Sequence, residues 1–215
     1  DQTKEAVDAE RQEGKTVAKS FTYDIKVLKN GEEIQPADGS KVKVSFALAT
    51  AANTNLDATV YHVTDDGAKA LETSVEGETV SAETDGFSLY TVEFTYQELQ
   101  YVLPGGETVP LSTVLDTLQL SGEVQGVTVS NPELFSCEIV DGVWTVSSHQ
   151  PFQTDEWMNV TLDGIPYNIK VTDAITHTVT FDMKGRATDK TPASQSVEDG
   201  KRASDPFPKT EDKKI

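Results

Sequence analysis

The chain has 215 residues, of which 36% are hydrophobic and 7% aromatic, and its 36 acidic and 18 basic residues give a formal net charge of −18. This length allows one large domain or two to three small ones. A field of this sign repels phosphate backbones and anionic membrane surfaces, so we expect no nucleic-acid partner. The sequence has no apolar run long enough for a signal peptide or a membrane span, and we expect no membrane insertion.

The first half of the chain changes its periodicity near residue 20. Residues 1–19 are polar and poor in β-branched residues, which predicts a short helix or a disordered linker. From Phe21 apolar and polar residues alternate, which predicts strands. Asn30 and Gly31 supply a hairpin turn, and short strands separated by Gly and Asp turns follow. We therefore expect a β-sandwich at 20–97.

The same alternation places two lysines of these strands. Lys26 and Lys43 fall on the polar phase, whereas Val44 and Phe46 fall on the apolar phase. A lysine that cross-links to asparagine inside a core must point inward. The pattern therefore argues against such a cross-link.

A second module is expected at 98–173. Its first part shows one short helical pattern, in which Thr113 and Asp116 resemble a capping box. Strands follow, and two pairs of them are separated by Asp-Gly hairpin turns, at Asp141-Gly142 and Asp163-Gly164. The pattern predicts a small β-rich module with one helix.

Residues 174–215 begin with an alternating stretch, "HTVTFDMKG", which predicts a strand. An extended piece at "ASQSVEDGKRAS" and a Pro-rich tail follow. The remaining apolar residues are too few to close a core, so we expect this segment to be disordered or docked on its neighbour. We also expect the chain to be a segment of a longer protein.

The residues that could carry catalysis are scattered. His62, His149 and His177 are far apart in sequence, and no Gly-x-Ser-x-Gly or papain-like signature accompanies Ser147 or Cys137. The chain has only this one cysteine, so it can form neither an intramolecular disulfide nor a Cys-x-x-Cys motif. We expect Cys137 to be a partly buried small hydrophobic residue, and we expect no catalytic or cofactor site.

Metal binding is weakly supported. No His-Glu-x-x-His motif or short His spacing is present, so we expect no zinc site. The acidic turn Thr64–Gly67 could supply oxygen ligands to calcium, but it lacks an Asp-x-Asp-x-Asp-Gly loop. Solvated turn residues are the favoured interpretation, and calcium binding stays open.

The two tryptophans are the remaining candidates for contact with a partner. Trp144 and Trp157 each lie in a predicted strand, where core packing is the favoured role. If either is exposed beside "SHQPFQTDE", it would anchor a protein or glycan partner. The candidate contact residues are Trp144, His149, Phe152 and Trp157.

Three stretches resemble modules of Gram-positive surface proteins. "HTVTFDMKG" followed by "SVEDGKRASDPFPKTED" resembles the first half of the internalin-type B-repeat, also called the Listeria–Bacteroides repeat, whose aromatic last part is missing here. The stretch from "YDIKVLKNGEEI" to "TDGFSLYTVEF" is similar to ZU5-like and Ig-like sandwich modules. "SNPELFSCEIVDGVWTVSSHQPFQTDEWMNVTLDG" is similar to a small module often found between such sandwiches and B-repeats. "FPKTED" resembles a sortase signal, but no hydrophobic tail follows it.

These resemblances imply a mainly β protein built of tandem small modules: a β-sandwich at 20–97, a β-rich module with one short helix at 98–173 and a truncated β-grasp-like repeat at 174–215. They imply a non-catalytic stalk or display region of an adhesin-like protein on the bacterial cell surface or cell wall. We expect a monomer whose partner, if it has one, is a protein or glycan on host surfaces or in host secretions.

Two alternatives stay open. The first is a specific binder of a host protein, such as immunoglobulin or a mucosal glycoprotein. It predicts a defined apolar patch or an unpaired edge strand on one module. The second is an accessory, non-catalytic region of a secreted glycosidase or protease.

Overall fold

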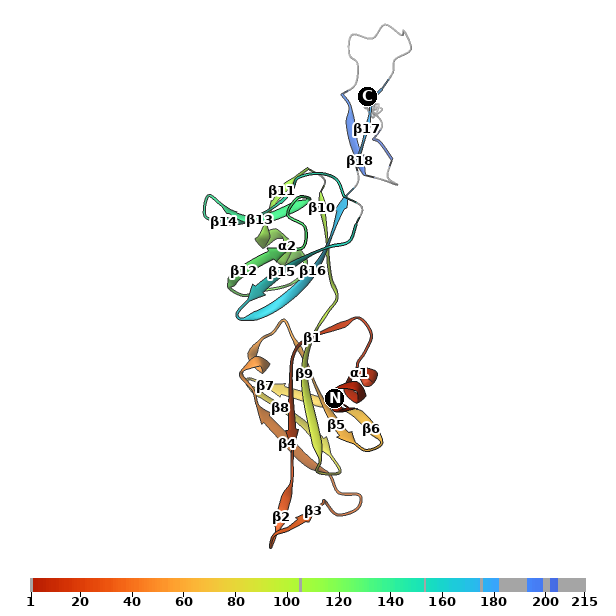
Figure 1. The fold of residues 1–215 in the computed structure, drawn as a ribbon, viewed down its shortest axis with the longest axis vertical. Helices are drawn as coiled ribbons and strands as arrows, with labels where there is room; N and C mark the ends of the chain where they lie inside the picture. The colour runs from red at the N-terminus through yellow and green to blue at the C-terminus, as the bar shows by residue number, and fades with distance from the viewer. Residues whose placement is uncertain are drawn as a thin grey trace, which may run out of the picture. The chain divides into compact units, whose positions relative to one another are not determined.

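The computed structural model describes residues 2–104, 106–152, 154–174, 176–181, 193–198 and 202–204. This part of the chain is mainly β, with two α-helices and several separate antiparallel sheets (Figure 1), which confirms the predicted fold class at that level. None of the described helices has the length and apolar character needed to cross a membrane.

The chain divides into two compact units. The first comprises Asp1–Leu99 with the short segments Gln119–Gln125 and Thr161–Tyr167. The second comprises Gln100–Leu118, Gly126–Val160 and Asn168–Ile215. We refer to residues 2–99 as the first β region and to residues 100–174 as the second β region.

Two antiparallel sheets form the first β region. One has the order β1-β9-β5-β6, with β1 at Lys15–Asp24, β9 at Leu89–Gln97, β5 at Asp57–Thr64 and β6 at Gly67–Leu71. The other has the order β4-β8-β7, with β4 at Val42–Ala47, β8 at Thr79–Thr84 and β7 at Thr73–Glu76. A separate hairpin pairs β2, Val27–Lys29, with β3, Glu32–Ile34, and a 3-10 helix spans Ala49–Ala52.

The two sheets share one core. Val44 and Phe46 of β4 pack in the same buried cluster as Val60 of β5 and Tyr90 of β9. The side chains of a strand alternate between its two faces, so the residues between these apolar positions point outward. Lys43 is exposed, as is Lys26, so both lysines lie outside the core as the alternation predicts.

Strand β1 begins earlier than the sequence predicts. It starts at Lys15, within the segment expected to be a helix or linker, although that segment does contain a helix, α1, at Gln2–Glu10. The pairing of β1 with β9 shifts register between Val17 and Lys19, where a bulge interrupts the ladder. The bulge breaks the alternation ahead of Phe21. The period-two pattern in the sequence therefore begins at Phe21, although the strand itself begins at Lys15.

Helix α1 covers the outer face of the β1-β9-β5-β6 sheet. Val7 is 1% exposed and packs in one cluster with Tyr61 and Val63 of β5. A helix of nine residues is marginal on its own in water. Its stability therefore comes from this apolar contact and from the ion pair that follows it.

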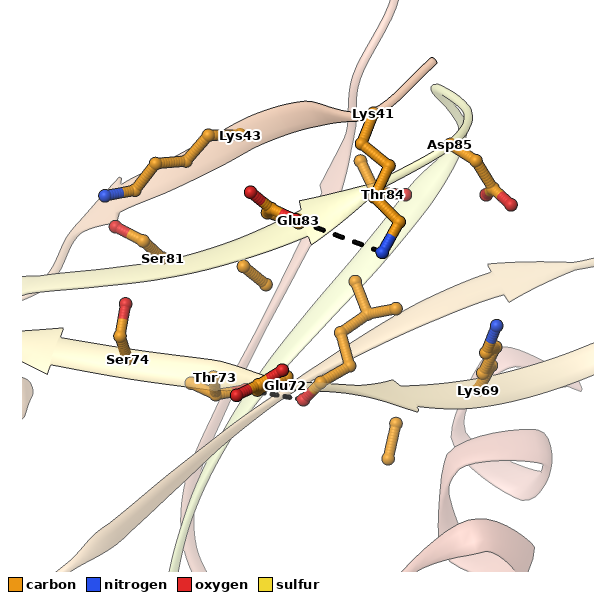
Figure 2. Close-up of a pocket in the computed structure, with 13 residues that line it drawn as sticks. Lys41, Lys43, Lys69, Glu72, Thr73, Ser74, Ser81, Glu83, Thr84 and Asp85 are labelled. Carbon is orange, nitrogen blue, oxygen red and sulfur yellow. Dashed lines mark hydrogen bonds and ion pairs between the residues drawn. The ribbon is translucent and has the colours of Figure 1, made fainter. Parts of the chain in front are cut away.

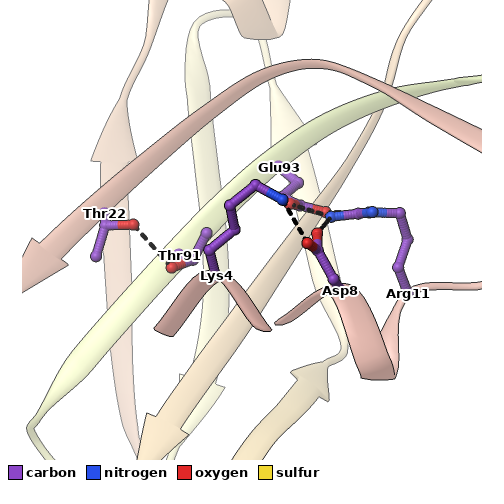
Figure 3. Close-up of polar contacts among 6 residues, drawn as sticks. All are labelled: Lys4, Asp8, Arg11, Thr22, Thr91 and Glu93. Carbon is purple, nitrogen blue, oxygen red and sulfur yellow. Dashed lines mark hydrogen bonds and ion pairs between the residues drawn. The ribbon is translucent and has the colours of Figure 1, made fainter. Parts of the chain in front are cut away.

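Arg11 fastens the end of α1 to the central strand β9 (Figure 3). Its Nε donates to Oε2 of Glu93 at 2.8 Å and its Nη2 donates to Oε1 at 2.7 Å. Arg11 also pairs with Asp8, and Asp8 pairs with Lys4. The bonds to Glu93 raise the pKa of Arg11, and the hydrogen bonds from Lys4 and Arg11 lower the pKa of Asp8. The Glu93 side chain is only 4% exposed, so its charge depends on Arg11 for compensation.

Two further sheets form the second β region. One has the order β10-β16-β15-β12, with β10 at Leu99–Pro104, β16 at Ile165–Ala174, β15 at Glu156–Leu162 and β12 at Val124–Val129. The other has the order β11-β14-β13, with β11 at Thr108–Pro110, β14 at Val143–Ser148 and β13 at Phe135–Val140. Helix α2, Leu111–Thr117, lies against β11 and β14.

Helix α2 confirms the predicted helix but not its predicted start. It begins at Leu111 after Pro110, which occupies the N-cap, so the predicted capping box at Thr113 is wrong. Thr113 lies inside the helix, where its carbonyl accepts a hydrogen bond from the hydroxyl of Thr117 at 2.7 Å. The dihedral that proline fixes suits a helix entrance without a side-chain cap.

The last described segments form a small hairpin. Strand β17, Thr176–Val179, pairs with β18, Gln195–Glu198, so the start of "HTVTFDMKG" is a strand as predicted and "QSVE" is its partner. Residues 182–192, 199–201 and 205–215, which hold the rest of the predicted repeat, lie outside the described residues.

We predict that Arg11→Ala lowers the free energy of unfolding by about 2 to 3 kcal/mol, because it leaves the Glu93 carboxylate buried without a partner. The loss should fall short of that for a fully buried pair, since the Arg11 side chain keeps 16% of its surface exposed. Urea unfolding followed by circular dichroism measures it. Lys15→Ala is the control: its partner Asp57 is 63% exposed, so it should cost less than about 1 kcal/mol. Equal losses for both variants would show that the Arg11–Glu93 pair does not fasten α1.

Candidate functional site

A groove of about 560 Å³ runs along β4, β8 and the β6–β7 segment of the first β region (Figure 2). Its charged residues are three lysines and three carboxylates: Lys41, Lys43, Lys69, Glu72, Glu83 and Asp85. The Nζ of Lys41 lies 4.0 Å from a carboxylate oxygen of Glu83. Because these charges cancel and no described lining residue is aromatic, the groove offers neither a net field for an anion nor a stacking platform for a sugar. We assign it no ligand.

The three histidines are not brought together. His62 stacks on Tyr90 with ring centroids 4.7 Å apart, and its Nε2 lies 2.8 Å from the hydroxyl of Ser88. Burial lowers the pKa of His62, which favours a neutral, structural imidazole. His149, which follows β14, and His177 on β17 are exposed. Within the described ranges no group of three or more His, Cys, Asp or Glu side chains could hold a metal ion.

Cys137 is half-buried in β13, as expected for a small hydrophobic residue. Burial, with a smaller effect from the charge of Glu138, raises the pKa of its thiol to about 11. Only the thiolate is a strong nucleophile. At neutral pH the side chain is therefore protonated and poorly suited to nucleophilic chemistry.

The four predicted contact residues do not form one site. Phe152, a predicted contact residue, is 5% exposed and stacks on Phe135 with ring centroids 5.9 Å apart, so the structure places it in the core. His149 is exposed. Trp157 lies on β15 and is 38% exposed, whereas Trp144 lies half-buried on β14 of the other sheet. The sequence could not separate Phe152 from its neighbours because its burial depends on Phe135, which is distant along the chain.

The hairpin of β13 and β14 is the most exposed apolar feature of the second β region. Its strands are joined by Asp141 and Gly142, whose φ angles of 50° and 81° make a two-residue turn of the type I′ class. Ile139 pairs with Trp144 across the strands, and Val140 pairs with Val143. We call residues 139–144 the hairpin tip. In Figure 1 the tip projects away from α2.

Apolar side chains continue along the hairpin into the tip, beyond the part of β14 that α2 contacts. Phe135, 0% exposed, and Val146, 1% exposed, lie on the core face at the base of the hairpin, where α2 lies against β14. Since side chains alternate, Ile139 and Trp144 lie on this same face. Ile139 is nevertheless 61% exposed, and Val140 and Val143 on the opposite face are each 51% exposed. The tip therefore carries exposed apolar side chains on both of its faces, and uncovered apolar surface of this kind is typical of an interaction surface.

Strand β13 is also an edge strand. Its sheet has the order β11-β14-β13, and in the described part of the chain no strand pairs with its outer side. In a two-residue hairpin the residues next to the turn, here Val140 and Val143, exchange both backbone hydrogen bonds. The N–H and C=O groups of every second residue of β13 then point away from β14. The N–H and C=O of Cys137 and Ile139 therefore face the open edge.

The sequence around this hairpin has one sign of charge. Residues 100–169 contain no lysine or arginine. They contain nine acidic residues: Glu107, Asp116, Glu123, Glu133, Glu138, Asp141, Asp155, Glu156 and Asp163. Two of these, Glu138 and Asp141, belong to the hairpin itself. The field at the tip is therefore negative, which favours a basic partner.

No protein-family model matches the chain, and no curated protein is significantly similar to it.

The three exposed apolar residues of the tip, Ile139, Val140 and Val143, are not among the contact residues predicted from the sequence. One signal could have found them. In "EIVDGVW" apolar residues stand next to one another on both sides of a turn, where alternation requires every second residue to be polar. Such a run at a turn is buried only if another element covers it.

We predict that the Cys137 thiol reacts at least about tenfold more slowly with iodoacetamide at pH 8 than the same thiol in the urea-unfolded protein. A pKa of about 11 leaves far less thiolate at that pH than the value of about 8.5 for a free cysteine. The rate should still be rising with pH at pH 10. Mass spectrometry of timed samples measures both rates, and rapid alkylation of the folded protein at pH 7 would contradict an inert thiol.

Proposed function

We propose that the chain is a non-catalytic part of an adhesin-like, extracellular protein of a Gram-positive bacterial surface, and that it contacts a protein partner through the hairpin tip. The observation that carries the proposal is the apolar tip, where Ile139 on the core face and Val140 and Val143 on the opposite face are all exposed. An uncovered patch and an unpaired edge strand are the two features expected of a binder, and both occur on this one hairpin.

The type of fold that we assign to each region is part of the same proposal. We interpret the first β region as a ZU5-like or Ig-like β-sandwich, since its two sheets share one core. We interpret the second β region as the β-rich module with one helix, and the β17–β18 hairpin as the start of a truncated B-repeat of β-grasp type. The quoted sequence resemblances support each interpretation.

The energetics of the tip suit a moderate contact. Full burial of a Val or Ile side chain contributes about 1.5 to 3 kcal/mol. Ile139, Val140 and Val143 are each at least 51% exposed, so covering all three would contribute roughly 3 kcal/mol before Trp144 is counted. The two-residue turn holds these side chains on a rigid frame, which reduces the entropy lost on binding.

The side chains that could carry catalysis support a non-enzymatic role. The thiol of Cys137 is protonated at neutral pH, and His62 is engaged with Tyr90 and Ser88. Display on a cell surface remains the broader function in which this contact operates. Immunoglobulin and mucosal glycoproteins are the candidate partners, and an accessory role beside a secreted glycosidase or protease is the alternative.

We predict that the immobilised chain captures a protein from human serum or mucosal secretions, and that Val143→Lys reduces the capture at least about tenfold. The added charge would have to be buried in an apolar contact, which is unfavourable. Pull-down at physiological salt with mass-spectrometric identification measures the capture.

Val75→Lys is the matched control. Val75 is 45% exposed on strand β7, so this variant carries the same change of charge and side chain in the first β region. It should capture as much as the unchanged chain, and both variants should keep its circular dichroism spectrum. Equal capture by Val143→Lys would remove the tip from the proposal. No capture by the unchanged chain would leave only the display role.

A further inference from the structure

We propose that the open edge of β13 is a strand-docking site, and that its ligand is an extended peptide segment in which apolar and basic residues alternate. The segment would add a fourth strand to the β11-β14-β13 sheet. This inference rests on the proposed function and names the chemistry of its partner. Three observations carry it: the direction of the free backbone groups, the alternation of side chains along β13, and the local charge.

The backbone of β13 offers a short pairing edge. Cys137 and Ile139 direct their N–H and C=O groups away from β14, since Val140 and Val143 close the two-residue turn with their own hydrogen bonds. Backbone groups in this position are the donors and acceptors that strand addition uses. An added strand would therefore form hydrogen bonds with Cys137 and Ile139 without breaking any bond between β13 and β14.

The side chains of β13 set the sequence of the ligand. A residue placed opposite Ile139 would lie on the face that carries Ile139 and Trp144, where an apolar side chain extends the patch. A residue placed opposite Glu138 would lie on the other face, next to an exposed carboxylate. A basic side chain is favoured there because opposite charges stabilise a cross-strand pair. The ligand pattern is therefore apolar, basic, apolar.

The charge of the region reinforces this pattern over a longer range. Residues 100–169 carry nine carboxylates and no lysine or arginine, so a segment with several basic residues is attracted before it makes contact. An acidic strand would be repelled by the same field. The attraction should weaken as salt rises, because the Debye length falls to about 8 Å at physiological ionic strength.

A second copy of this chain is a poorer ligand than a basic segment. If two β13 edges paired about a two-fold axis and used the free groups of Cys137 and Ile139, each Cys137 would face an Ile139 and the two Glu138 residues would face each other. Like charges directly opposite one another are destabilising. The net charge of −18 adds a general repulsion between copies.

The experiment uses the whole chain, labelled with ¹⁵N, and four short blocked peptides. The first alternates valine and lysine, the second alternates valine and glutamate, and the third alternates serine and lysine. The fourth is the valine–lysine peptide with N-methyl groups on all of its internal residues, so that neither of its edges can donate hydrogen bonds. Titration by NMR gives affinities, and amide hydrogen exchange shows which backbone groups become protected.

We expect only the unmodified valine–lysine peptide to bind well, with at least about tenfold weaker binding of the other three. The amides of Cys137 and Ile139 should become protected from exchange when it binds. Protection confined to other strands, or equal binding of the N-methylated peptide, would overturn the proposal. Equal binding of the serine–lysine peptide would show that charge alone is recognised and would overturn it as well.

Two variants test the geometry. Glu138→Lys should reverse the preference, so that the valine–glutamate peptide binds better than the valine–lysine peptide. Ile139→Pro should abolish binding, because it removes a donor that faces the open edge while leaving the bonds to β14 in place. Its circular dichroism and the protection of Val140 should match those of the unchanged chain. An unreversed preference in Glu138→Lys would contradict the assigned side-chain pattern.

The same variants separate this inference from the proposed function. If Val143→Lys reduces capture of a serum or mucosal protein while Ile139→Pro does not, the tip binds but the edge does not, and the inference is wrong. If neither variant reduces capture, the tip is not the contact surface of the proposed function and the inference is wrong as well. A concentration-dependent dimer that Ile139→Pro abolishes, seen by sedimentation, would make a second copy the occupant and would also overturn the inference.

Discussion

Tight two-residue turns are the constraint on which the exposed surface of this protein depends. Asn30-Gly31, Asp141-Gly142 and Asp163-Gly164 all have positive φ at both positions, which closes each hairpin in one register. A slip by one residue would move every side chain of a strand to the opposite face. The turn at Asp141 therefore decides both that Phe135 is buried and that the backbone of Ile139 faces outward.

The features that the sequence predicts are those that depend on neighbouring residues. Alternation places Val44 and Phe46 in the core and Lys43 outside it, and the Asp-Gly pairs mark the turns. The bulge after Val17 hides the start of β1 because it breaks the same alternation. The bidentate pair between Arg11 and Glu93 joins residues 82 positions apart, and no local pattern foretells it.

The hairpin tip shows the same difference between features that neighbouring residues predict and features that depend on distant parts of the chain. Val143 and Val146 are residues of one type on one strand, yet the first is 51% exposed and the second 1% exposed. Their difference comes from the faces that they occupy, since Val146 lies on the core face against which α2 packs and Val143 lies on the opposite face, which no described helix covers. Trp144 is a candidate contact residue from its type alone, whereas the exposure of Ile139, Val140 and Val143 depends on which elements pack over the hairpin.

The pairing of β1 with β9 has a mechanical consequence for a chain under tension. These strands are antiparallel, with Lys15 opposite Gln97, and Gly14 accepts a hydrogen bond of 2.8 Å from the N–H of Glu98. The chain thus enters β1 and leaves β9 at the same end of the ladder. Tension between these two points would load the hydrogen bonds one after another, as in opening a zipper, rather than all together in shear. Under such tension, the first β region would therefore yield at low force and lengthen, and so limit the load carried by the rest of the chain.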